Sequence, residues 1–453
     1  MTQQQSIKTI PGPRGWPLSG NLYRLKKDIL QCLLDDREKY GAIVKYRIGH
    51  FKYIALNNPA YIRQVLLENK DNYTKQTLSN EQSKYITGDS LLTLYGDRWH
   101  QQRRRMQGTF RKTAVASYFS DMVLETNRYI DRWQQHADNK VSITREMSAL
   151  TYAIVGKALF GLDMDDSNDK IQESLDIALN YIHSRIESLI RLPLWGYTPK
   201  QRAFKNAIKQ FDSVVHNMIE QRSQDQTPRN DLLGKLLAAV DEEDNTRMSR
   251  EQVRNELITL LLAGHETTAN LMTWCLYELA KQPELQENIY QEVGTLDLNN
   301  IEAQQLLKLD YTYRIIQESL RLYPPVWLME RHTVSTDSID GYRIPKGTTI
   351  IINPWVMHRH TDYWRYPDIF NPDNFLPENF KQIPDYVFIP FGKGPRMCIG
   401  MNFAIQESMI MLARIIQSFK LYNASDIEIQ PIPSITLRPP KEISLKFVPR
   451  GTS

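Results

Sequence analysis

The alternation of apolar and polar residues predicts both helices and short strands along the chain. A helical pattern covers Ile29–Tyr40, and successive amphipathic helical patterns follow between residues 113 and 190. Ala42–Gly49 and Tyr53–Leu56 are rich in β-branched and aromatic residues and have a short polar connection, which predicts a hairpin. Pro59 is expected to open another helix, because its missing N–H costs little at the first helical position.

Two further segments carry weaker patterns. Thr74–Gly88 is polar and irregular, which predicts a mobile loop. The C-terminal stretch Ile429–Gly451 has short apolar runs on both sides of Pro439 and Pro440, and we predict a β-hairpin with its turn at these prolines.

The longest apolar run extends from Glu251 to Lys281 and predicts a helix that is buried on all sides. Its middle, AGHETT at residues 263–268, interrupts this pattern with a glycine and a carboxylate. Glycine inside a helix costs about 1 kcal/mol relative to alanine, and a buried carboxylate is costly unless it has a use. The interruption predicts either a tolerated polar notch or a local widening where a ligand binds against the backbone. Helical spacing turns His265 away from its polar neighbours, so we expect it to be structural.

Composition narrows the class of protein. The 453 residues would allow about three domains at roughly 150 residues each, but we find neither a linker nor a repeat and expect one domain over residues 1–453. The net charge of +4 is too small to indicate a nucleic-acid partner. Cys32, Cys275 and Cys398 show no disulfide or zinc spacing, which favours a reducing, cytoplasmic location. The N-terminal segment has no apolar run long enough for a membrane span or a signal core, so we expect a soluble protein.

A loop near the C-terminus carries the most specific chemical pattern, Phe391-x-x-Gly394-x-Arg396-x-Cys398-x-Gly400. Glycine adopts backbone conformations closed to other residues and can bring N–H groups close to a sulfur. A helix that begins just after Cys398 would direct its positive dipole end towards a thiolate. Such a thiolate, with no second cysteine or histidine at metal-finger spacing, suits a single axial bond to haem iron. The alternative is a buried structural cysteine.

This pattern resembles the haem-binding loop of the cytochrome P-450 family, and further motifs in the expected order extend the resemblance over essentially the whole chain. The resemblance implies a mainly α fold with a small β region, built around haem b. It also implies that Cys398 is the axial ligand of the iron, that Arg396 contacts a haem propionate and that Phe391 packs against the sulfur side. Gly400 belongs to the same cofactor-binding loop.

Other haem contacts of the family have counterparts in this chain. Trp99 and Arg103 lie four residues apart and share one face of a helix. The resemblance makes them a propionate-binding pair, and an exposed basic helix with a half-buried tryptophan is the alternative. Arg331 stands where the family commonly supplies another propionate contact. Charge-assisted hydrogen bonds of this kind contribute about 1.5–3 kcal/mol each.

The AGHETT segment resembles the oxygen-binding groove of the family. The resemblance makes Ala263 and Gly264 part of the backbone that faces the haem, and Glu266 and Thr267 an acid–alcohol pair. Cleavage of the O–O bond of O2 requires two protons. Thr267 is expected to hold the reacting oxygen by a hydrogen bond, while Glu266 relays protons through water.

Glu318 and Arg321 match the structural Glu-x-x-Arg signature of the family. As an exposed pair they would contribute only about 0.2–0.5 kcal/mol. The family usually adds an arginine as a third partner, where this chain has Asn374. An asparagine can hydrogen-bond a carboxylate but carries no charge, which puts the usual ionic network in doubt. The resemblance also implies that Val326–Met329 and Ile432–Ile435 line the substrate pocket and that Thr74–Gly88 forms part of its wall.

Basic residues cluster on and beyond the helix of Trp99, namely Arg98, Arg104, Arg105, Arg111 and Lys112. A run of charge is usually a solvated face. In the family, however, this helix lies on the cysteine side of the haem, and we therefore expect a docking patch for an acidic electron donor.

The resemblance implies a monooxygenase that inserts one atom of O2 into a lipophilic substrate, such as a fatty acid, terpenoid, steroid or polyketide intermediate. Electrons are expected from a separate ferredoxin or flavodoxin with its reductase, because no flavin or iron–sulfur domain is appended. One alternative is a haem-thiolate enzyme that uses peroxide or rearranges lipids, against which the Glu266–Thr267 pair argues. A second is a non-catalytic haem sensor, in which a proton relay would have no purpose.

Overall fold

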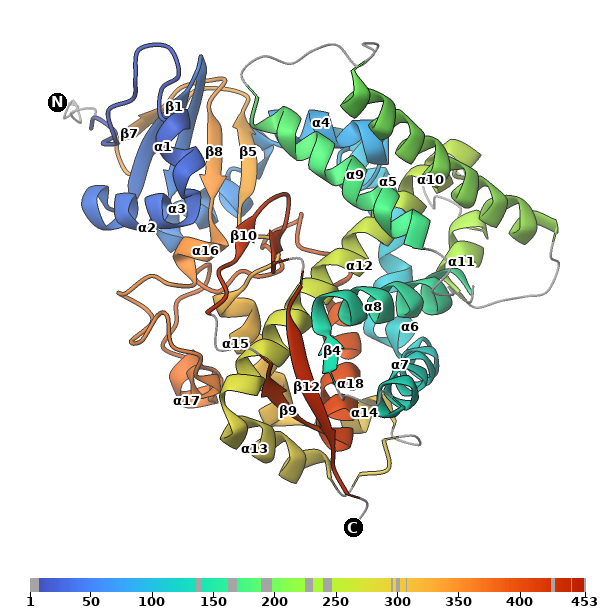
Figure 1. Cartoon of the computed structure of the whole chain (residues 1–453). Helices are drawn as coiled ribbons and strands as arrows, with labels where there is room; N and C mark the ends of the chain where they lie inside the picture. The colour runs from blue at the N-terminus through green and yellow to red at the C-terminus, as the bar shows by residue number, and fades with distance from the viewer. Residues whose placement is uncertain are drawn as a thin grey trace.

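The segment with the longest apolar run forms α12 (Arg250–Lys281), which crosses the middle of the molecule (Figure 1). A capping box closes its first turn, because the side chains of Ser249 and Gln252 each accept the backbone N–H of the other residue. Trp274 and Leu276 in its second half are fully buried. The computed structural model describes residues 8–135, 140–161, 169–188, 198–224, 231–238, 247–294, 296–298, 302–306, 308–424, 428–440 and 442–451.

Helices make up most of the described residues, as predicted. Those before α12 are α1 (Leu22–Lys27), α2 (Ile29–Tyr40), α3 (Pro59–Arg63), α4 (Leu78–Thr87), α5 (Gly96–Gln107), α6 (Lys112–Ala116), α7 (Phe119–Gln134), α8 (Ile143–Phe160), α9 (Asp169–Ile186), α10 (Pro199–Gln224) and α11 (Leu232–Ala238). Those after it are α13 (Pro283–Val293), α14 (Ala303–Leu306), α15 (Asp310–Leu322), α16 (Pro354–Met357), α17 (Pro377–Phe380) and α18 (Met401–Ser418). Single π or 3-10 turns occur at Gln64–Glu68, Lys70–Asn72, Gly108–Phe110 and Pro372–Phe375.

The strands form one larger sheet and several small ones. The larger sheet has the order β1 (Ile43–Ile48), β2 (Phe51–Leu56), β8 (Thr349–Ile352), β5 (Met329–Thr333) and β3 (Tyr73–Thr74). Its β1 and β2 are the predicted hairpin, and β2 runs parallel to β8. A second sheet has the order β4 (Lys140–Ser142), β12 (Ser444–Pro449) and β9 (Phe419–Asn423). The two-stranded pairs are β6 (Asp337–Ile339) with β7 (Tyr342–Ile344), and β10 (Ile432–Pro433) with β11 (Leu437–Arg438).

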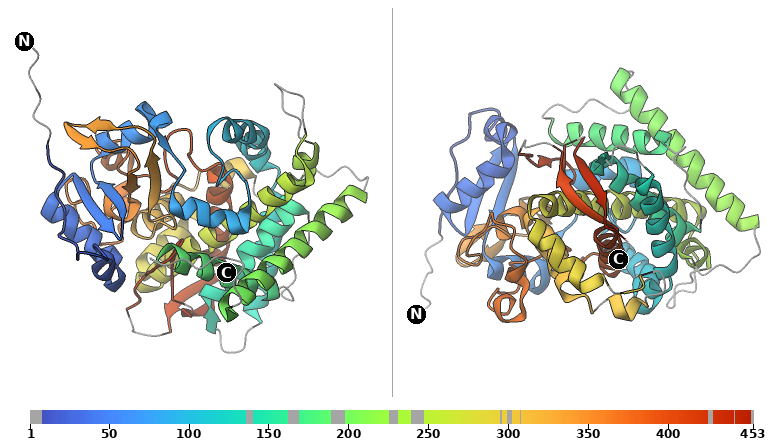
Figure 2. Two further views of the ribbon diagram at one scale, coloured as in Figure 1. Left: turned by 90° about the horizontal axis from the view of Figure 1, so that it is seen from above. Right: turned by 60° about the horizontal axis from the view of Figure 1, so that its bottom comes forward.

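The main hydrophobic core surrounds α12. It contains buried residues of α7, α8, α12, α15 and α18, among them Met147, Val155, Trp274 and Met411. Figure 1 shows the larger sheet with α1, α2 and α3 on one side of the molecule and α7, α8, α10 and α11 on the other, and Figure 2 gives two further views of this arrangement. Within the described residues, no helix combines the length and the apolar character that a membrane crossing needs.

The predicted loop at Thr74–Gly88 is wrong, because most of this segment is α4. The helix has both terminal signals, since the Thr77 hydroxyl accepts the N–H of Asn80 and the chain leaves through Gly88 with φ of +59°. The buried face of α4 includes polar side chains that bond to distant partners. The Asn80 amide donates to the Thr93 carbonyl at 2.8 Å. A hydrophobic pattern could not reveal a helix whose buried positions are polar.

The predicted C-terminal hairpin is also wrong in its turn. β10 and β11 pair across residues 434–436, before the two prolines. β12 does not return along this hairpin but pairs with β9 and β4 in the second sheet. Leu445 and Phe447 on β12 are fully buried there, so the more apolar strand packs in the core. The short hairpin of β10 and β11 instead contacts α12.

Candidate active site

The cysteine loop is closed by backbone contacts just before α18. The Cys398 N–H donates to the Phe391 carbonyl at 2.9 Å. Gly394 has φ of +74°, and a Cβ at this position would lie 2.3 Å from the carbonyl oxygen of Leu66. Only glycine fits such a position. The loop therefore fixes where the sulfur lies relative to the first turn of α18.

The Cys398 side chain is exposed, whereas its loop neighbours are half-buried. Desolvation nevertheless raises the pKa of its thiol, and the N–H groups of Gly400 and Met401 and the guanidinium of Arg103 act in the opposite direction. A sulfur that is both accessible and desolvated faces an internal space rather than bulk water. Desolvation outweighs the N–H groups at the start of α18, and a cation bonded to the sulfur would favour the thiolate.

Trp99 and Arg103 lie beside this loop, on α5. The Arg103 guanidinium donates to the Met397 carbonyl at 3.1 Å. The Arg396 guanidinium stacks on the Trp99 ring, with its central carbon 4.0 Å from the ring centroid, and donates to the Leu94 carbonyl at 2.8 Å. Trp99 and Arg103 of α5 and Arg396 of the cysteine loop, which were predicted separately, thus form a single cluster.

Arg331 and Lys75 complete a group of mutually repelling cations. Arg331 lies on β5 and is 6% exposed. Burial, followed by the charges of Arg331 and Arg103, lowers the pKa of Arg396 to about 9. Burial, followed by the charges of Arg331 and Arg396, lowers the pKa of Lys75 to about 7, and the Glu330 carboxylate opposes this change. Sequence reasoning missed Lys75, because it lies in a segment with no motif and meets the arginines only through the fold.

The middle of α12 is the accessible part of an otherwise buried helix. Ala263 is exposed and Thr267, one turn later, is half-buried. The Thr267 hydroxyl donates to the Ala263 carbonyl at 2.5 Å. The α-helix is continuous through this segment, so the predicted widening does not take the form of a break in the helix. The space left by Gly264 lies towards α8, where a Cβ would be 3.3 Å from Val155.

Glu266 is held by the C-terminal hairpin. Its Oε1 accepts hydrogen bonds from the Thr436 hydroxyl and from Arg438 Nε, both at 2.6 Å. Arg438 also pairs with Asp176 of α9 at 3.3 Å. Burial disfavours the charged guanidinium, but the Glu266 and Asp176 carboxylates outweigh it and raise the pKa of Arg438. Sequence reasoning missed this arginine, which carried no motif.

His265 points away from this network, as predicted. Its Nε2 lies 2.9 Å from the Ser148 hydroxyl, and its ring meets Tyr152 edge-on. Burial lowers the pKa of His265 to about 4. The histidine is therefore neutral at physiological pH and belongs to the contact between α8 and α12.

A second buried acid, Glu407, lies on α18 and was also missed. Burial raises its pKa well above the usual range, and the hydroxyl of Thr268, next to Thr267, opposes this change. A buried carboxyl group whose neutral form is favoured thus lies beside Thr268 of α12. The available signal was an acidic residue within the apolar run that follows Cys398.

A cavity of about 720 Å³ borders the accessible part of α12. Leu262, Ala263 and Thr267 form one wall. Apolar residues of α9, the predicted segment Val326–Met329 and residues 433–436 of the hairpin form the others. α4 contributes as well, so the expectation that residues 74–88 form part of a pocket wall is confirmed for a helix rather than a loop. A cavity of this volume and lining suits a lipophilic small molecule.

The Glu318–Arg321 pair is fully buried rather than exposed. The guanidinium forms two 2.7 Å bonds to the carboxylate. The Asn374 amide donates to Glu318 at 3.1 Å, so the departure from the family's arginine keeps a hydrogen bond but no charge. The remaining guanidinium N–H groups donate to the carbonyls of His358, Pro367 and Ile369. This network fixes the segment that leads to the cysteine loop.

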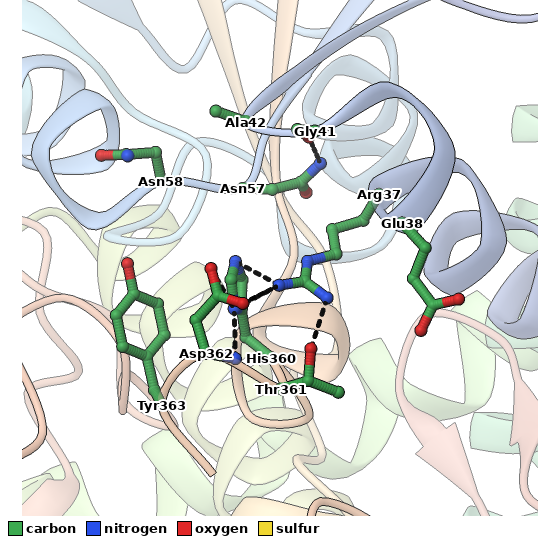
Figure 3. Close-up of a pocket in the computed structure, with 10 residues that line it drawn as sticks. All are labelled: Arg37, Glu38, Gly41, Ala42, Asn57, Asn58, His360, Thr361, Asp362 and Tyr363. Atoms are coloured by element: carbon green, nitrogen blue, oxygen red, sulfur yellow. Dashed lines mark hydrogen bonds and ion pairs between the residues drawn. The ribbon is translucent and has the colours of Figure 1, made fainter.

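A separate polar pocket of about 410 Å³ lies between α2 and the segment after α16 (Figure 3). Arg37 lines this pocket. Its guanidinium donates to Thr361 at 2.9 Å and to Asp362 at 3.1 Å, and it lies 2.6 Å from His360 Nδ1 (Figure 3). His358 accepts the N–H of Ile389. Both histidines are thus structural, and the described residues contain no cluster suited to a metal ion.

The sequence model of the family described as Cytochrome P450 matches residues 10–447 of this chain. The chain belongs to the cytochrome P450 family. Similar proteins include pentalenene oxygenase of Streptomyces avermitilis, 29% identical over 99% of both chains. Cyclooctatin synthase of Streptomyces melanosporofaciens is 31% identical over 96% of this chain and 93% of its own. Cyclooctat-9-en-7-ol 5-monooxygenase of the same organism is 28% identical over 95% and 91%.

Membership of the cytochrome P450 family makes the protein an oxidoreductase with a haem-thiolate cofactor. The residues fit that group. An accessible, desolvated sulfur and four converging cations with one opposing carboxylate suit an iron and two propionates. The mainly helical fold with small sheets agrees with the fold that the sequence resemblance implied.

Proposed function

We propose that the protein inserts one atom of O2 into a cyclic terpenoid or a similarly lipophilic molecule. The observation that carries this proposal is the 720 Å³ cavity, whose largely apolar wall ends at Ala263 and Thr267. Pentalenene and cyclooctat-9-en-7-ol, the compounds in the names of two relatives, are cyclic terpenoids. They favour this class over the fatty acids, steroids and polyketide intermediates that the sequence left open. Part of the proposal is that residues 1–453 act as one domain.

Cys398 is proposed as the axial thiolate. When bound, the haem supplies an iron at which O2 is reduced, and the thiolate donates electron density that favours O–O cleavage. The cysteine loop contributes Phe391 on the sulfur side and Gly400 at the start of α18. Ala263 and Gly264 of α12 would supply the backbone that faces the cofactor. The proposed propionate contacts are Trp99, Arg103, Arg331 and Arg396, with Lys75 added by its place among the arginines.

Protons are proposed to reach the cavity through the polar residues of α12. Because the Thr267 hydroxyl donates its hydrogen to Ala263, its oxygen lone pairs are available to water in the cavity. Glu266 is bound through Oε1 by Thr436 and Arg438, so Oε2 is the atom through which it would exchange a proton. Glu407, buried beside Thr268, is a second reserve of protons.

Electrons are proposed to come from a ferredoxin or flavodoxin with its reductase. Arg104, Arg111 and Lys112 are exposed on and after α5, whose Arg103 lies beside the cysteine loop. We expect Arg104→Glu with Lys112→Glu to slow reduction and flatten its dependence on salt, because an acidic donor would lose attraction. Lys420→Glu with Lys446→Glu makes the same change of charge and is the control, since these exposed residues lie on β9 and β12. Equal rates in both variants would exclude this patch as the docking site. The reducing, cytoplasmic location stays a prediction.

The function is tested by turnover of cyclic terpenes with a surrogate ferredoxin and reductase under ¹⁸O2. The proposal predicts a spin-state shift on binding and a product that carries one labelled oxygen. Thr267→Ala should form less product per O2 consumed, because the protons would no longer be delivered in place. Full activity with peroxide alone, equal in Thr267→Ala, would favour the peroxide-using alternative. Binding without turnover by any donor would favour the sensor.

A further inference from the structure

One wall of the large cavity is polar, and it is formed by α4. Ser79, Asn80, Ser83 and Thr87 line the cavity from this helix. They share one face of α4, because residues three and four apart lie next to each other on a helix surface. The wall that α9 contributes is mainly apolar by contrast. A few polar groups in an otherwise apolar cavity usually fix the orientation of a ligand.

The hydroxyl groups of this wall already use their hydrogens. Ser83 Oγ donates to the Ser79 carbonyl at 2.9 Å, and Thr87 Oγ1 donates to the Ser83 carbonyl at 3.3 Å. The Ser79 hydroxyl donates to the carboxylate of Glu330 on β5. These oxygens therefore meet a ligand as hydrogen-bond acceptors, because a hydroxyl has one hydrogen and two lone pairs.

Two oxygens of the wall are open acceptors. The Asn80 amide donates to the Thr93 carbonyl at 2.8 Å, so its nitrogen faces that carbonyl and its Oδ1 is directed elsewhere. Within the described part of the chain, no donor bonds to Asn80 Oδ1 or to Ser83 Oγ. Both atoms remain accessible. Since both residues line the cavity, their oxygens offer acceptor positions to a molecule inside it.

The acceptor wall continues from α4 onto α12. Gly88, which ends α4, lies so close to α12 that a Cβ there would be 2.4 Å from Asn255 Oδ1. Thr259, one turn later, lines the cavity and donates its hydroxyl to the Asn255 carbonyl at 2.7 Å. Ala263 follows after about 6 Å along the helix. One molecule can therefore contact the acceptors while another of its carbons lies against Ala263.

The charges beside this wall favour a neutral ligand. Glu330 and Lys75 both line the cavity, and the two side chains interact. A ligand carboxylate would be repelled by Glu330 and attracted by Lys75. Because Lys75 belongs to the group of cations proposed for the propionates, the acid and the open acceptors are left to face the ligand. A neutral hydroxyl group is the donor that suits them.

We propose that the substrate is a cyclic terpenoid that already carries a hydroxyl group, which donates to Ser83 Oγ with Asn80 Oδ1 as a neighbouring acceptor. This inference rests on the proposed function and narrows its substrate class. An alcohol on a cyclic terpenoid arises when cyclisation ends by capture of water, or from an earlier hydroxylation. The protein would thus act after such an alcohol-forming step.

The proposal is tested by titrating the haem-loaded protein with compounds that share one carbon skeleton, namely cedrene, cedrenol, cedrenal and cedrenoic acid. They present a hydrocarbon, a hydroxyl, an aldehyde and a carboxylate. Calorimetry and the spin-state shift give the dissociation constants without turnover. We expect cedrenol to bind about tenfold or more tightly than cedrene and cedrenal, because neither of these can donate a hydrogen to the acceptors.

Ser83→Ala is the diagnostic variant, because it removes an acceptor and alanine is well tolerated in a helix. It should weaken cedrenol binding by about three- to tenfold and leave cedrene binding unchanged. Ser434→Ala is the matched control, since Ser434 lines the same cavity from the hairpin of β10 and β11. The control should keep the full preference for the alcohol, and both variants should keep the thermal midpoint of the unsubstituted protein.

Three results would overturn the proposal. Equal binding of cedrenol and cedrene, or an equal loss in Ser83→Ala and Ser434→Ala, would do so while leaving the oxygenation of cyclic terpenoids in place. Tightest binding by cedrenoic acid would favour a carboxylate held by Lys75 instead. A lack of binding by all of these compounds would overturn the inference together with the terpenoid class on which it rests.

Discussion

The contact between Arg438 and Glu266 allows a quantitative test of how the acid of α12 is positioned. Arg438→Gln removes the charge and the 2.6 Å bond to Glu266 Oε1, while the Thr436 bond remains. The two side chains are 20% and 14% exposed, so the pair is much closer to a buried pair than to a surface pair. Breaking a buried pair costs about 3–5 kcal/mol and an exposed one about 0.2–1 kcal/mol. We expect the variant to lose about 2–3 kcal/mol of unfolding free energy.

Arg438→Gln should reduce coupling, meaning the product formed per O2 consumed, more than it reduces substrate binding. General acid–base catalysis contributes about 10²–10⁴-fold, and Arg438 only positions the acid, so we expect product formed per O2 to fall on the order of tenfold.

The assay compares O2 consumption with product formation for the unsubstituted protein and three variants. Arg438→Lys should recover part of the coupling, because it restores the charge without the guanidinium geometry. Asp176→Asn removes a carboxylate that is 58% exposed, so it should cost about 0.2–1 kcal/mol and leave coupling intact. Unchanged coupling in Arg438→Gln, at full haem content, would refute the reasoning.

Three further outcomes follow from the geometry. Arg321→Gln should lose about 3–5 kcal/mol of unfolding free energy, because it leaves Glu318 buried with an uncompensated charge; urea unfolding measures this. Gly394→Ala should lose about 1–3 kcal/mol of unfolding free energy, since its φ of +74° is strained for alanine and the Leu66 carbonyl must move. A loss smaller than half of the lower value would contradict the close contact with Leu66. Lys75, with a folded pKa of about 7 against 10.5 unfolded, penalises folding of the haem-free protein below pH 7, and this penalty declines as pH rises towards 10.5. Urea unfolding at pH 7 and pH 9 should therefore show Lys75→Met to be more stable than the unsubstituted haem-free protein at the lower pH, with a smaller difference at the higher one.

The parts of the fold that local sequence determines were predicted. Ile29–Tyr40 is a helix with the predicted bounds, and β1 and β2 are the predicted hairpin, because periodicity and β-branched content act within a few residues. α4 could not be predicted in this way. Its buried positions include Asn80, whose partner Thr93 lies outside the helix, so long-range hydrogen bonds rather than apolar spacing hold its buried face.

The candidate site likewise contains residues that local sequence determines and residues that depend on long-range contacts. Cys398 and its loop could be predicted because contiguous residues determine the turn, including the positive φ of Gly394. Arg438 and Lys75 could not, because each acquires its role from partners more than a hundred residues away in sequence. The electrostatics of the sulfur could not be predicted from the loop alone for a similar reason. The N–H groups at the start of α18 lower the pKa of the thiol, but the surrounding fold desolvates the sulfur and raises it.

The central claim is that Cys398 binds haem iron through its sulfur. The most direct measurement is the absorption spectrum of the reduced protein with carbon monoxide, recorded for the unsubstituted chain and for Cys398→Ser. A strongly red-shifted Soret band that is present in the former and absent in the latter, with haem retained in both, is the predicted result. A band that Cys398→Ser leaves unchanged would contradict the account and make Cys398 a structural residue.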